Sequence, residues 1–565
     1  MNILGINYYF HDSSACLVVD GKIDVAIEEE RITRQKHTQA FPENAIARCL
    51  SSAGISATDV DAVAVSIKPS KDWGSKVAYG LRHAPNAQPF FLQEVTHAAR
   101  SQLLFRNWYR TTWPTNGPRV YFVPHHTAHA AGTFLASPYE DAAILSLDGS
   151  GEWATSFLGE GRGSRVTRFV ESYFPESLGY FYETATQFCG FRANYDEGKT
   201  MGLAPFGDPA IYGKTVDRLA TVDADGGIKI DLSYFAYQFH GRKRYSPRFI
   251  SEFGSPKEGT EFKANHKNVA AAFQRVLEDR ALELSAFLRR RSRSRHLVIA
   301  GGVALNSVMN GRILREAGFD DIYVMPAAGD NGTAIGAALY VSTVVLKQPR
   351  SHVHDDPYLG PAYSDEYIDK VLTDCKLRST KCDDIATTTA RMLADGKIVG
   401  WFQGRMEIGP RALGNRSILA DPTLPLMKDK INAEVKHREA FRPFAPSVQV
   451  ETKDKYFDII GESPVMLIVC PVRPEMRDLL PAITHVDGSA RLHTVSRTTN
   501  PVFHDLLGKF GAATGTPVLL NTSFNIQGEP IVESPEHAIR CFASTGLDAL
   551  AMGSFLITKD ELSDS

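Results

Sequence analysis

The chain has few cysteines and almost no net charge, and both shortages narrow its possible functions. Its seven cysteines among 565 residues are scattered, odd in number and never spaced as C-x-x-C. We therefore expect reduced thiols in a cytoplasmic protein. The formal net charge of −3 gives no basic footprint for nucleic acid. No run reaches the roughly 18 apolar residues of a membrane span, and no signal-peptide pattern precedes the first strand, so we expect neither nucleic acid nor membrane as a partner.

The composition is that of an ordinary globular protein, with 43% hydrophobic and 22% charged residues. The length is sufficient for two or three domains. Around residue 347 the pattern changes to a polar, proline-rich stretch, which marks a linker or a surface crossing. We predict an N-terminal domain at residues 1–347, a linker at residues 348–362 and a second domain at residues 363–565.

Three histidines stand close together between positions 125 and 129. On a helix, His125 and His129 lie on one face, where a divalent metal could bind both imidazoles, whereas His126 points elsewhere. A zinc protease helix has a glutamate at the second position of this motif, where this chain has His126, so metalloprotease chemistry is disfavoured. The spacing alone leaves a simple packing role for the two histidines equally open.

A strand-turn-strand-turn pattern in residues 2–24 recurs in residues 142–161. The strands are expected at residues 3–6 and 15–19 and at residues 143–147 and 152–157, with tight turns at 20–21 and 159–161. The first turn of each copy contains an acidic residue, Asp12 or Asp148. Such a repeat predicts a duplicated α/β domain of the actin, sugar kinase and Hsp70 ATPase superfold (the ribonuclease H-like class), with both turns facing one cleft. In that superfold the turns hold phosphates through backbone N–H groups.

Two later strand-to-helix turns fit the same cleft. A buried strand leads into Gly301 and Gly302, where a nucleoside could lie against the backbone and Asn306 could bind it. After the next strand, Asp330 lies at the tip of the turn and is a plausible metal ligand beside Asp148. A single glycine-rich turn is usually a matter of packing, but four in a consistent order favour a nucleotide site.

The second domain contains cationic and amide side chains in turns. The candidates for anion binding are Arg411, Lys436, Arg442, Arg491 and Asn521. Arginine can fork onto phosphate or carboxylate oxygens as lysine cannot. A solvated surface role is the ordinary interpretation of a single arginine, but glycine and proline beside Arg411 indicate a rigid turn that is costly unless the guanidinium is used. We therefore predict a pocket for a small anion.

Together these motifs closely resemble the O-carbamoyltransferases, which include nodulation-factor, cephalosporin and aminoglycoside carbamoyltransferases. The resemblance extends over nearly the whole chain. Its motifs are Phe10-His11-Asp12, Glu28 to His37, His125 to His129, Asp148 to Gly151, Gly198 to Ala204, Gly301 to Asn306, Gly404 to Gly414 and Asn521 to Asn525. It implies a Kae-like N-terminal domain of the actin-like (ASKHA) fold and a YrdC-like α/β C-terminal domain.

The resemblance also implies an ATP-dependent reaction. Carbamoyl phosphate binds in the C-terminal domain, and its carbamoyl unit reacts with ATP to give carbamoyladenylate and pyrophosphate. A hydroxyl of a small-molecule acceptor, such as a natural product or sugar, then attacks the adenylate in the N-terminal domain and AMP leaves. The implied metal is Fe²⁺, although Mn²⁺ or Zn²⁺ would suit the same ligands. We expect Mg²⁺ to accompany the nucleotide and the chain to form a homodimer.

Individual roles follow from positions that match the family motifs. The expected catalytic residues are His11 as general base, Asp12 beside it and Lys36 near the adenylate. The expected metal ligands are His125, His129, Asp148 and Asp330. The expected nucleotide site comprises Gly149, Ser150, Gly151, Lys199, Gly301, Gly302, Asn306 and Asn331. The expected carbamoyl phosphate site comprises Arg411, Lys436, Arg442, Arg491 and Asn521, while the role of Ser523 stays open.

Three other functions remain to be weighed. Threonylcarbamoyl transfer to tRNA would require a basic face, which the sequence does not indicate. A hydrogenase-maturation carbamoyltransferase would contain acylphosphatase and zinc-finger regions, which are missing. A nucleotide-binding scaffold would bind ATP without forming pyrophosphate when carbamoyl phosphate is added.

Overall fold

The computed structural model describes residues 1–239, 243–350, 353–354 and 356–559. They divide into two compact units. The first unit comprises Met1–Glu29 and His37–His354, and the second comprises Glu30–Lys36 and Asp355–Ser565. The short segment Glu30–Lys36 therefore groups with the C-terminal half of the sequence. Within the described residues, we find no helix with the length and apolar character needed to cross a bilayer.

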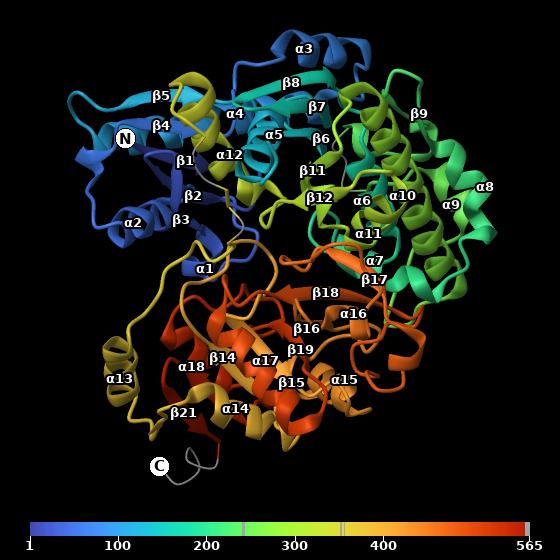
Figure 1. The fold of residues 1–565 in the computed structure, drawn as a ribbon. Helices are drawn as coiled ribbons and strands as arrows, with labels where there is room; N and C mark the ends of the chain where they lie inside the picture. Colours follow the sequence, from blue (N-terminus) through green and yellow to red (C-terminus); the bar gives the residue numbers. More distant parts are fainter. Residues whose placement is uncertain (240–242, 351–352, 355, 560–565) are drawn as a thin grey trace. The chain divides into compact units, whose positions relative to one another are not determined.

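The first unit contains two five-stranded sheets with the same topology (Figure 1). Their strands are β1 (Asn2–Asn7), β2 (Ser14–Val19), β3 (Lys22–Glu28), β4 (Ala62–Val65) and β5 (Arg119–Phe122), and β6 (Asp141–Leu147), β7 (Ser156–Arg162), β8 (Arg165–Val170), β11 (His296–Ala300) and β12 (Asp321–Val324). The orders are β3-β2-β1-β4-β5 and β8-β7-β6-β11-β12. In both sheets the first three strands are antiparallel and the last two are added in parallel. The predicted duplicated α/β fold of the actin superfold is confirmed.

The second copy of the repeat differs from the prediction in detail. The expected strand at 152–157 and turn at 159–161 are wrong. Strand β7 begins at Ser156 and continues through Gly159 and Gly161. The chain turns at Gly163 instead, where φ is +54°. A Cβ atom on Gly161 would lie 2.3 Å from the Phe134 ring. The glycine therefore permits a helix to pack closely on the strand, a role that a sequence pattern cannot distinguish from a turn.

Helices surround the two sheets and extend from them (Figure 1). In the first unit they are α2 (Glu43–Ser52), α3 (Trp73–Arg82), α4 (Gln88–Thr112), α5 (His125–Ala136), α6 (Leu178–Phe188), α7 (Glu197–Leu203), α8 (Ala210–Leu219), α9 (Pro247–Phe253), α10 (Ala264–Ser292), α11 (Ser307–Glu316) and α12 (Thr333–Leu339). Helix α1 (Glu29–Thr33) lies almost wholly in the segment that groups with the second unit. A small two-stranded sheet joins β9 (Ala220–Val222) to β10 (Ile228–Ile230).

Helix α5, which contains the histidine motif, is buried and held at both ends. At its start the Glu152 carboxylate accepts the backbone N–H of His125, at 3.0 and 3.2 Å. At its end the Arg350 guanidinium donates to the backbone carbonyls of Phe134 and Leu135, at 2.8 and 3.1 Å. An anion at the N-terminus and a cation at the C-terminus both interact favourably with the helix dipole. These contacts fix the helix that presents the histidines.

The second unit is built on a nine-stranded mixed sheet of order β13-β21-β20-β14-β15-β19-β16-β18-β17. Its strands are β13 (Thr380–Lys381), β14 (Val399–Phe402), β15 (Arg416–Ala420), β16 (Ala445–Gln449), β17 (Ile468–Pro471), β18 (Ser489–Val495), β19 (Val518–Ser523), β20 (Ala549–Met552) and β21 (Phe555–Thr558), and its helices are α13 (Asp365–Asp374), α14 (Ile385–Ala394), α15 (Met427–Lys430), α16 (Lys453–Tyr456), α17 (Pro501–Thr514) and α18 (Pro535–Ala543). Successive residues of β19 pack in different cores: Leu519 joins α14 and α17, while Leu520 joins α13 and α18. This alternation separates the two faces of the sheet.

The predicted linker, residues 348–362, is divided between the units at His354. Its second half, residues 357–361, is buried in the second unit. The carbonyl of Pro357 accepts the N–H of Ile408 at 2.8 Å, and the carbonyl of Pro361 accepts the N–H of Met406 at 3.0 Å. Proline lacks a donor but retains its acceptor, so a proline-rich stretch can pair in this way instead of crossing the surface.

Candidate metal centre and anion pocket

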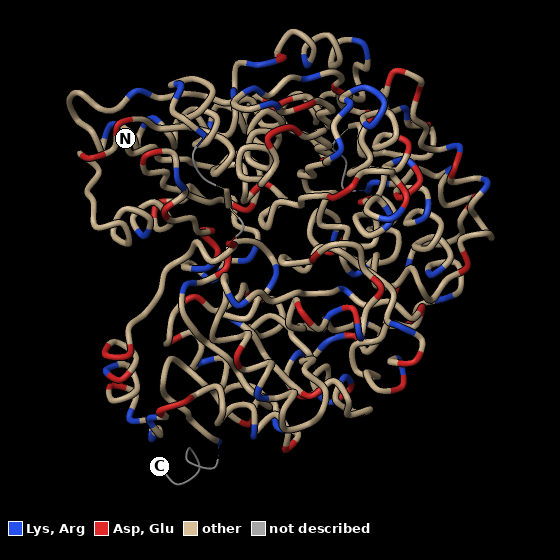
Figure 2. Tube along the Cα trace, viewed as in Figure 1, with Lys and Arg blue, Asp and Glu red and all other residues tan. Residues whose placement is uncertain are grey.

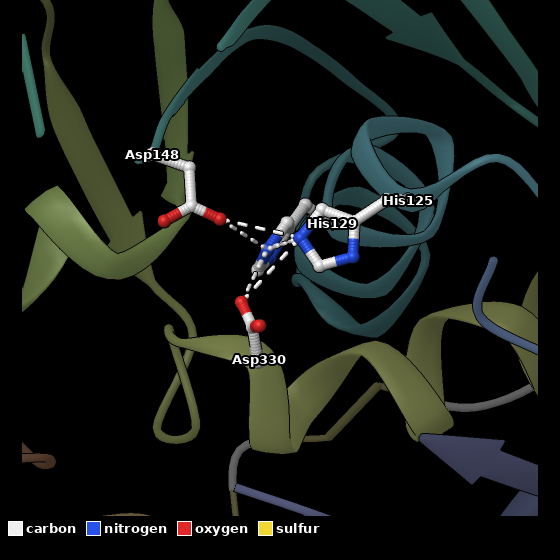
Figure 3. A group of neighbouring side chains, drawn as sticks. All are labelled: His125, His129, Asp148 and Asp330. Atoms are coloured by element: carbon white, nitrogen blue, oxygen red, sulfur yellow. Dashed lines mark hydrogen bonds and ion pairs between the residues drawn. The ribbon is translucent and has the colours of Figure 1, made fainter. Parts of the chain in front are cut away.

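Four buried side chains converge in one cluster of the first unit (Figure 3). His125 and His129 project from α5, Asp148 follows β6 and Asp330 begins a short helical turn. The two imidazole Nε2 atoms lie 3.1 Å apart, and each is 3.2 Å from Oδ2 of Asp148. They lie 3.4 and 3.6 Å from Oδ1 of Asp330. One donor atom from each residue lies within 4.8 Å of the others, which is compact enough for a single metal ion.

The donor set and its surroundings fit a divalent transition metal. Two imidazole nitrogens and two carboxylate oxygens suit iron, manganese or zinc. Oδ1 of Asp148 accepts the backbone N–H groups of Gly149 at 2.8 Å and Gly302 at 3.1 Å, while Oδ2 faces the imidazoles. Such contacts orient a ligand before the metal binds.

The three histidines of α5 differ in electrostatic environment. Burial lowers the pKa of His125, but the Asp330 and Asp148 carboxylates outweigh burial and raise the pKa to about 10. Burial and the charge of His125 lower the pKa of His126 to about 3. His126 contacts the Ser146 hydroxyl and the Ala154 carbonyl instead of the cluster, as the helical spacing predicts.

A second group of polar side chains lies beside this cluster in the first unit. The Asp12 carboxylate bridges two imidazoles, with Oδ2 at 2.9 Å from Nδ1 of His11 and Oδ1 at 2.7 Å from Nδ1 of His37. Nε2 of His11 lies 3.8 Å from Asp330. Burial lowers the pKa of His11, but Asp330 and Asp12 leave it well above its usual value. His11 is thus oriented by Asp12 at the edge of the candidate metal centre.

The glycine-rich turns predicted to hold phosphates lie around Asp148, but several of their N–H groups are used internally. Besides the two that bind Asp148, the N–H of Gly151 donates to the Ala154 carbonyl at 2.7 Å and that of Gly301 to the Ala328 carbonyl at 2.8 Å. Gly301 has φ +88°, and a Cβ atom there would lie 2.1 Å from the Leu147 carbonyl oxygen. Local packing thus requires this glycine.

The remaining predicted nucleotide residues also have defined partners. The Ser150 hydroxyl lies 2.9 Å from that of Tyr180. The Asn306 amide caps α11 and exchanges hydrogen bonds of 2.9 and 3.0 Å with Gln274. The Asn331 amide donates to Glu28 at 3.0 Å. Lys199 pairs with Asp196 at 3.1 Å. Asn306 thus links α11 to α10, Asn331 is bonded to β3, and Lys199 lies on α7.

The second unit contains a cluster of four arginines: Arg411, Arg438, Arg442 and Arg491. Burial and the charge of Arg442 lower the pKa of Arg411 to about 10 and that of Arg438 to about 9. Burial and the other three guanidinium groups hold the pKa of Arg491 well below its usual range. Several positive charges near one another attract an anion. Of the five residues predicted to bind an anion, Arg411, Arg442 and Arg491 are neighbours in this cluster.

Lys436 and Asn521 lie on elements next to this cluster. The Lys436 ammonium donates to the carbonyl and hydroxyl of Ser523 and to Asn525, whose side-chain oxygen is at 2.7 Å. Burial, Arg438 and other nearby cations hold the pKa of Lys436 well below its usual range. Lys36 is among those cations, so the structure places it near Lys436 in the second unit, and its position near the adenylate stays a prediction.

Comparison with known families agrees with both halves of this description. A family model described as the carbamoyltransferase N-terminus matches residues 2–339, and one described as the carbamoyltransferase C-terminus matches residues 390–559. The chain belongs to the carbamoyltransferase family. The resemblance expected from the sequence motifs is thereby confirmed, and the protein is an enzyme of this class.

Relatives of this carbamoyltransferase include named bacterial proteins. The nodulation protein NolNO of Sinorhizobium fredii is 38% identical over 98% of this chain and 80% of its own length. NolO of Bradyrhizobium diazoefficiens is 40% identical over 77% and 78% of the two chains. The 3'-hydroxymethylcephem-O-carbamoyltransferase of Streptomyces clavuligerus is 35% identical over 61% of each. Among solved structures, a ROK family glucokinase from Streptomyces griseus aligns with 60% of this chain and 98% of its own at 15% identity, with a TM-score of 0.29.

The sequence prediction missed two residues that shape these sites in the carbamoyltransferase. Arg438 belongs to the arginine cluster but received no role, although it lies between Lys436 and Arg442 in one motif. Glu152 holds the start of α5 from the loop after Asp148. A carboxylate in a glycine-rich turn was a usable signal, but only the folded structure brings it to the first N–H of α5.

Proposed function

We propose that this carbamoyltransferase forms carbamoyladenylate in its second unit and transfers the carbamoyl group to a small-molecule hydroxyl in its first. The observation that supports this division is the opposite chemistry of the two sites. The second unit concentrates four guanidinium groups, which suit phosphate oxygens. The first contains the candidate metal centre with an oriented histidine beside it. The acceptor class follows the relatives, one of which is named for a hydroxymethyl acceptor.

In the first step, water releases carbamate and inorganic phosphate from carbamoyl phosphate. An oxygen of carbamate then attacks the α-phosphorus of ATP, and pyrophosphate leaves. Arg411, Arg442 and Arg491 bind the phosphoryl oxygens and stabilise the negative charge that develops on them. Lys436 and Asn521 complete the pocket.

In the second step, the acceptor oxygen attacks the carbamoyl carbon of the adenylate and AMP leaves. His11 takes the hydroxyl proton at Nε2, because its Nδ1 is engaged by Asp12. A metal held by Asp330 would offset the carboxylate charge that raises the pKa of His11, so the imidazole would be neutral in the loaded enzyme. The small residues Gly149, Ser150, Gly301 and Gly302 leave room for the nucleotide beside Asp148, while the N–H groups of the three glycines support the turns themselves. The products are a carbamate ester and AMP.

The candidate metal is iron, held by His125, His129, Asp148 and Asp330. When bound, it supplies Lewis-acid and template chemistry for nucleotide oxygens. The protein's own contribution is to orient Asp148 through two backbone N–H groups and to keep the ligands away from water, since all four residues are buried.

The decisive test measures the two steps separately. The enzyme is incubated with ATP, Mg²⁺ and carbamoyl phosphate, and pyrophosphate is measured; AMP release is then measured with and without a candidate alcohol. We expect pyrophosphate only when carbamoyl phosphate is present, and alcohol-dependent AMP. ATP binding without pyrophosphate would instead identify a nucleotide-binding scaffold and overturn the proposed chemistry.

The charge distribution supports a small acceptor over tRNA. Lys and Arg segments alternate with Asp and Glu segments along the traced chain (Figure 2). A tRNA-modifying enzyme needs a continuous basic surface for the phosphate backbone. Carbamoyl or threonylcarbamoyl transfer to a tRNA substrate, measured under the same conditions, would contradict the proposal.

A further inference from the structure

The amide of Asn521 is buried in the second unit and has a defined orientation. The residue is 1% exposed and lies on β19. Its Nδ2 donates to the Ala412 carbonyl at 3.3 Å and to the Ser447 hydroxyl at 2.9 Å. A carbonyl can only accept, so turning the amide over would place two oxygens against each other. Both hydrogens of Nδ2 are thus assigned within the protein.

The Ser447 hydroxyl is in turn hydrogen-bonded to a histidine, which fixes the direction of the bonds. Its Oγ lies 2.8 Å from Nδ1 of His493, and both residues are at most 1% exposed. Burial lowers the pKa of His493 to about 3, so the imidazole is neutral and one of its nitrogens can accept. Since Ser447 accepts from Asn521, its own hydrogen is available for Nδ1 of His493. The three side chains form a one-directional chain of hydrogen bonds, here called the amide relay.

The oxygen of the Asn521 amide remains without a hydrogen bond. Among the described residues, no group donates to Oδ1 of Asn521, although the atom is buried. A buried acceptor without a donor costs free energy, so such an atom in a binding pocket indicates a donor on the ligand.

This acceptor lies next to the arginine cluster. Nδ2 of Asn521 contacts Ala412, which follows Arg411 in the chain. Arg491 precedes His493 by two residues on β18, so both side chains lie on the same face of the sheet. On β19, Ser523 lies two residues beyond Asn521 and contacts Lys436. The matching ligand therefore presents anionic oxygens and an N–H donor together.

We propose that Ser447 and His493, through the amide relay, orient Asn521 to accept a hydrogen bond from the carbamoyl amino group. Asn521 thereby selects carbamoyl phosphate over other acyl phosphates. This inference rests on the proposed function, in which the second unit binds carbamoyl phosphate. Oδ1 of Asn521 accepts a hydrogen from the –NH₂ group while the arginines hold the phosphate. Acetyl phosphate has the same phosphate but a methyl group in place of –NH₂, and would leave the buried oxygen unpaired. Asn521 contacts the ligand, and Ser447 and His493 are positioning residues.

Two stable ligands test the selection directly. Carbamoylphosphonate and acetylphosphonate differ only in an amino group against a methyl group, and each is titrated calorimetrically into the full-length enzyme. We expect carbamoylphosphonate to bind about tenfold to hundredfold more tightly, which is the range for one unsatisfied buried group. Equal affinity for the two ligands would overturn the selection while the proposed carbamoyl phosphate site stands. Binding of neither ligand would overturn the site itself and the selection with it.

The positioning role is tested with two substitutions at one residue. Ser447→Ala removes the shorter of the two hydrogen bonds that orient the amide, at 2.9 Å, and leaves the 3.3 Å contact with the Ala412 carbonyl, so we expect the ratio of the two affinities to fall by about threefold to tenfold. Ser447→Thr retains the hydroxyl and is expected to restore the preference. Inorganic phosphate, which uses only the cationic cluster, is expected to bind both variants and the unmodified enzyme alike.

These measurements separate a specific effect from a structural one. A general loss of structure in Ser447→Ala would weaken phosphate and both phosphonates equally, which would overturn the positioning role. Retention of the full preference in Ser447→Ala would overturn it also. The comparison in the unmodified enzyme needs no variant, so the selection by Asn521 is tested even if Ser447→Ala does not fold.

Discussion

The two units of this carbamoyltransferase contain polar clusters of opposite design. In the first unit, two imidazoles and two carboxylates lie 3.1 to 3.6 Å apart, and a proton on His125 offsets part of the carboxylate charge. In the second, four arginines lie together, and burial with the neighbouring guanidinium charges lowers the pKa values of Arg411, Arg438 and Arg491. The first cluster balances positive and negative groups, whereas the second concentrates positive charge, which attracts an anion. This difference is the basis of the proposed division of the two steps between the units.

The largest expected effect separates the two steps in the first unit. His11→Asn removes the base oriented by Asp12, so we expect transfer to the acceptor to fall by about 10²- to 10⁴-fold, the usual contribution of general base catalysis. Pyrophosphate formation should change by no more than about twofold, since it depends on the other unit. Alcohol-dependent AMP release and pyrophosphate release measure the two steps.

A matched histidine provides the control for this substitution. His504 in the second unit also pairs with a carboxylate, Glu451, at 3.1 Å, but lies in neither site. His504→Asn is expected to leave both steps unchanged. If His11→Asn abolished pyrophosphate release as well, the assignment of steps to units would be wrong.

The next largest effect is expected in the second unit. Arg411→Ala should reduce pyrophosphate formation by about 10²- to 10³-fold, because one donor to the developing phosphoryl charge is removed. Arg540 is an exposed arginine of the same unit, paired with Glu529 at 2.7 Å, and Arg540→Ala should have little effect. Loss of the transfer step alone in Arg411→Ala would remove the basis for the comparison.

A smaller effect is expected on metal binding, where two histidines of one helix form a matched pair. His129→Asn removes a residue that would bind the metal directly. Loss of a residue that only hydrogen-bonds to a metal ligand already lowers metal affinity by about tenfold to hundredfold, so we expect a decrease at least as large here. His126→Asn removes a buried imidazole of the same helix that contacts Ser146 and Ala154 instead. Elemental analysis after dialysis against dilute metal measures the content of each variant. Equal metal loss in both variants would attribute the effect to the helix and not to the ligands.

The features that the sequence predicts well are those made by neighbouring residues. The spacing of His125 and His129 suffices to place two imidazoles on one helix face. Asp148 follows β6 and Asp330 follows β12, the two strands that lie parallel to β11 on either side of it. The fold follows from the repeat for the same reason, since each copy contains its own turns. Local geometry fixes these relationships before tertiary packing contributes.

The features that the sequence does not predict depend on pairing between distant segments. Asn521 and Ser447 are 74 residues apart and Ser447 and His493 are 46 apart, so the amide relay exists only once β19, β16 and β18 are neighbours. The amide of Asn306 likewise caps α11 and binds Gln274, a contact between residues 32 apart. Strand order and cap geometry decide both cases, and neither leaves a periodic signal.

The smallest expected effect is on stability and concerns the packing that supports the metal-bearing helix. In Gly161→Ala, the new methyl group meets the Phe134 ring of α5, so we expect the first unit to lose about 1–3 kcal/mol of unfolding free energy. Gly213 lies within α8 with no atom within 4 Å of an added Cβ, so Gly213→Ala should instead gain about 0.5–1 kcal/mol from helix propensity. Urea denaturation followed by fluorescence measures both, and saturating inorganic phosphate should leave both free energies unchanged, because that ligand binds the second unit. If phosphate raised both, the two units would unfold as one, and their clusters could not be treated as separately stabilised sites.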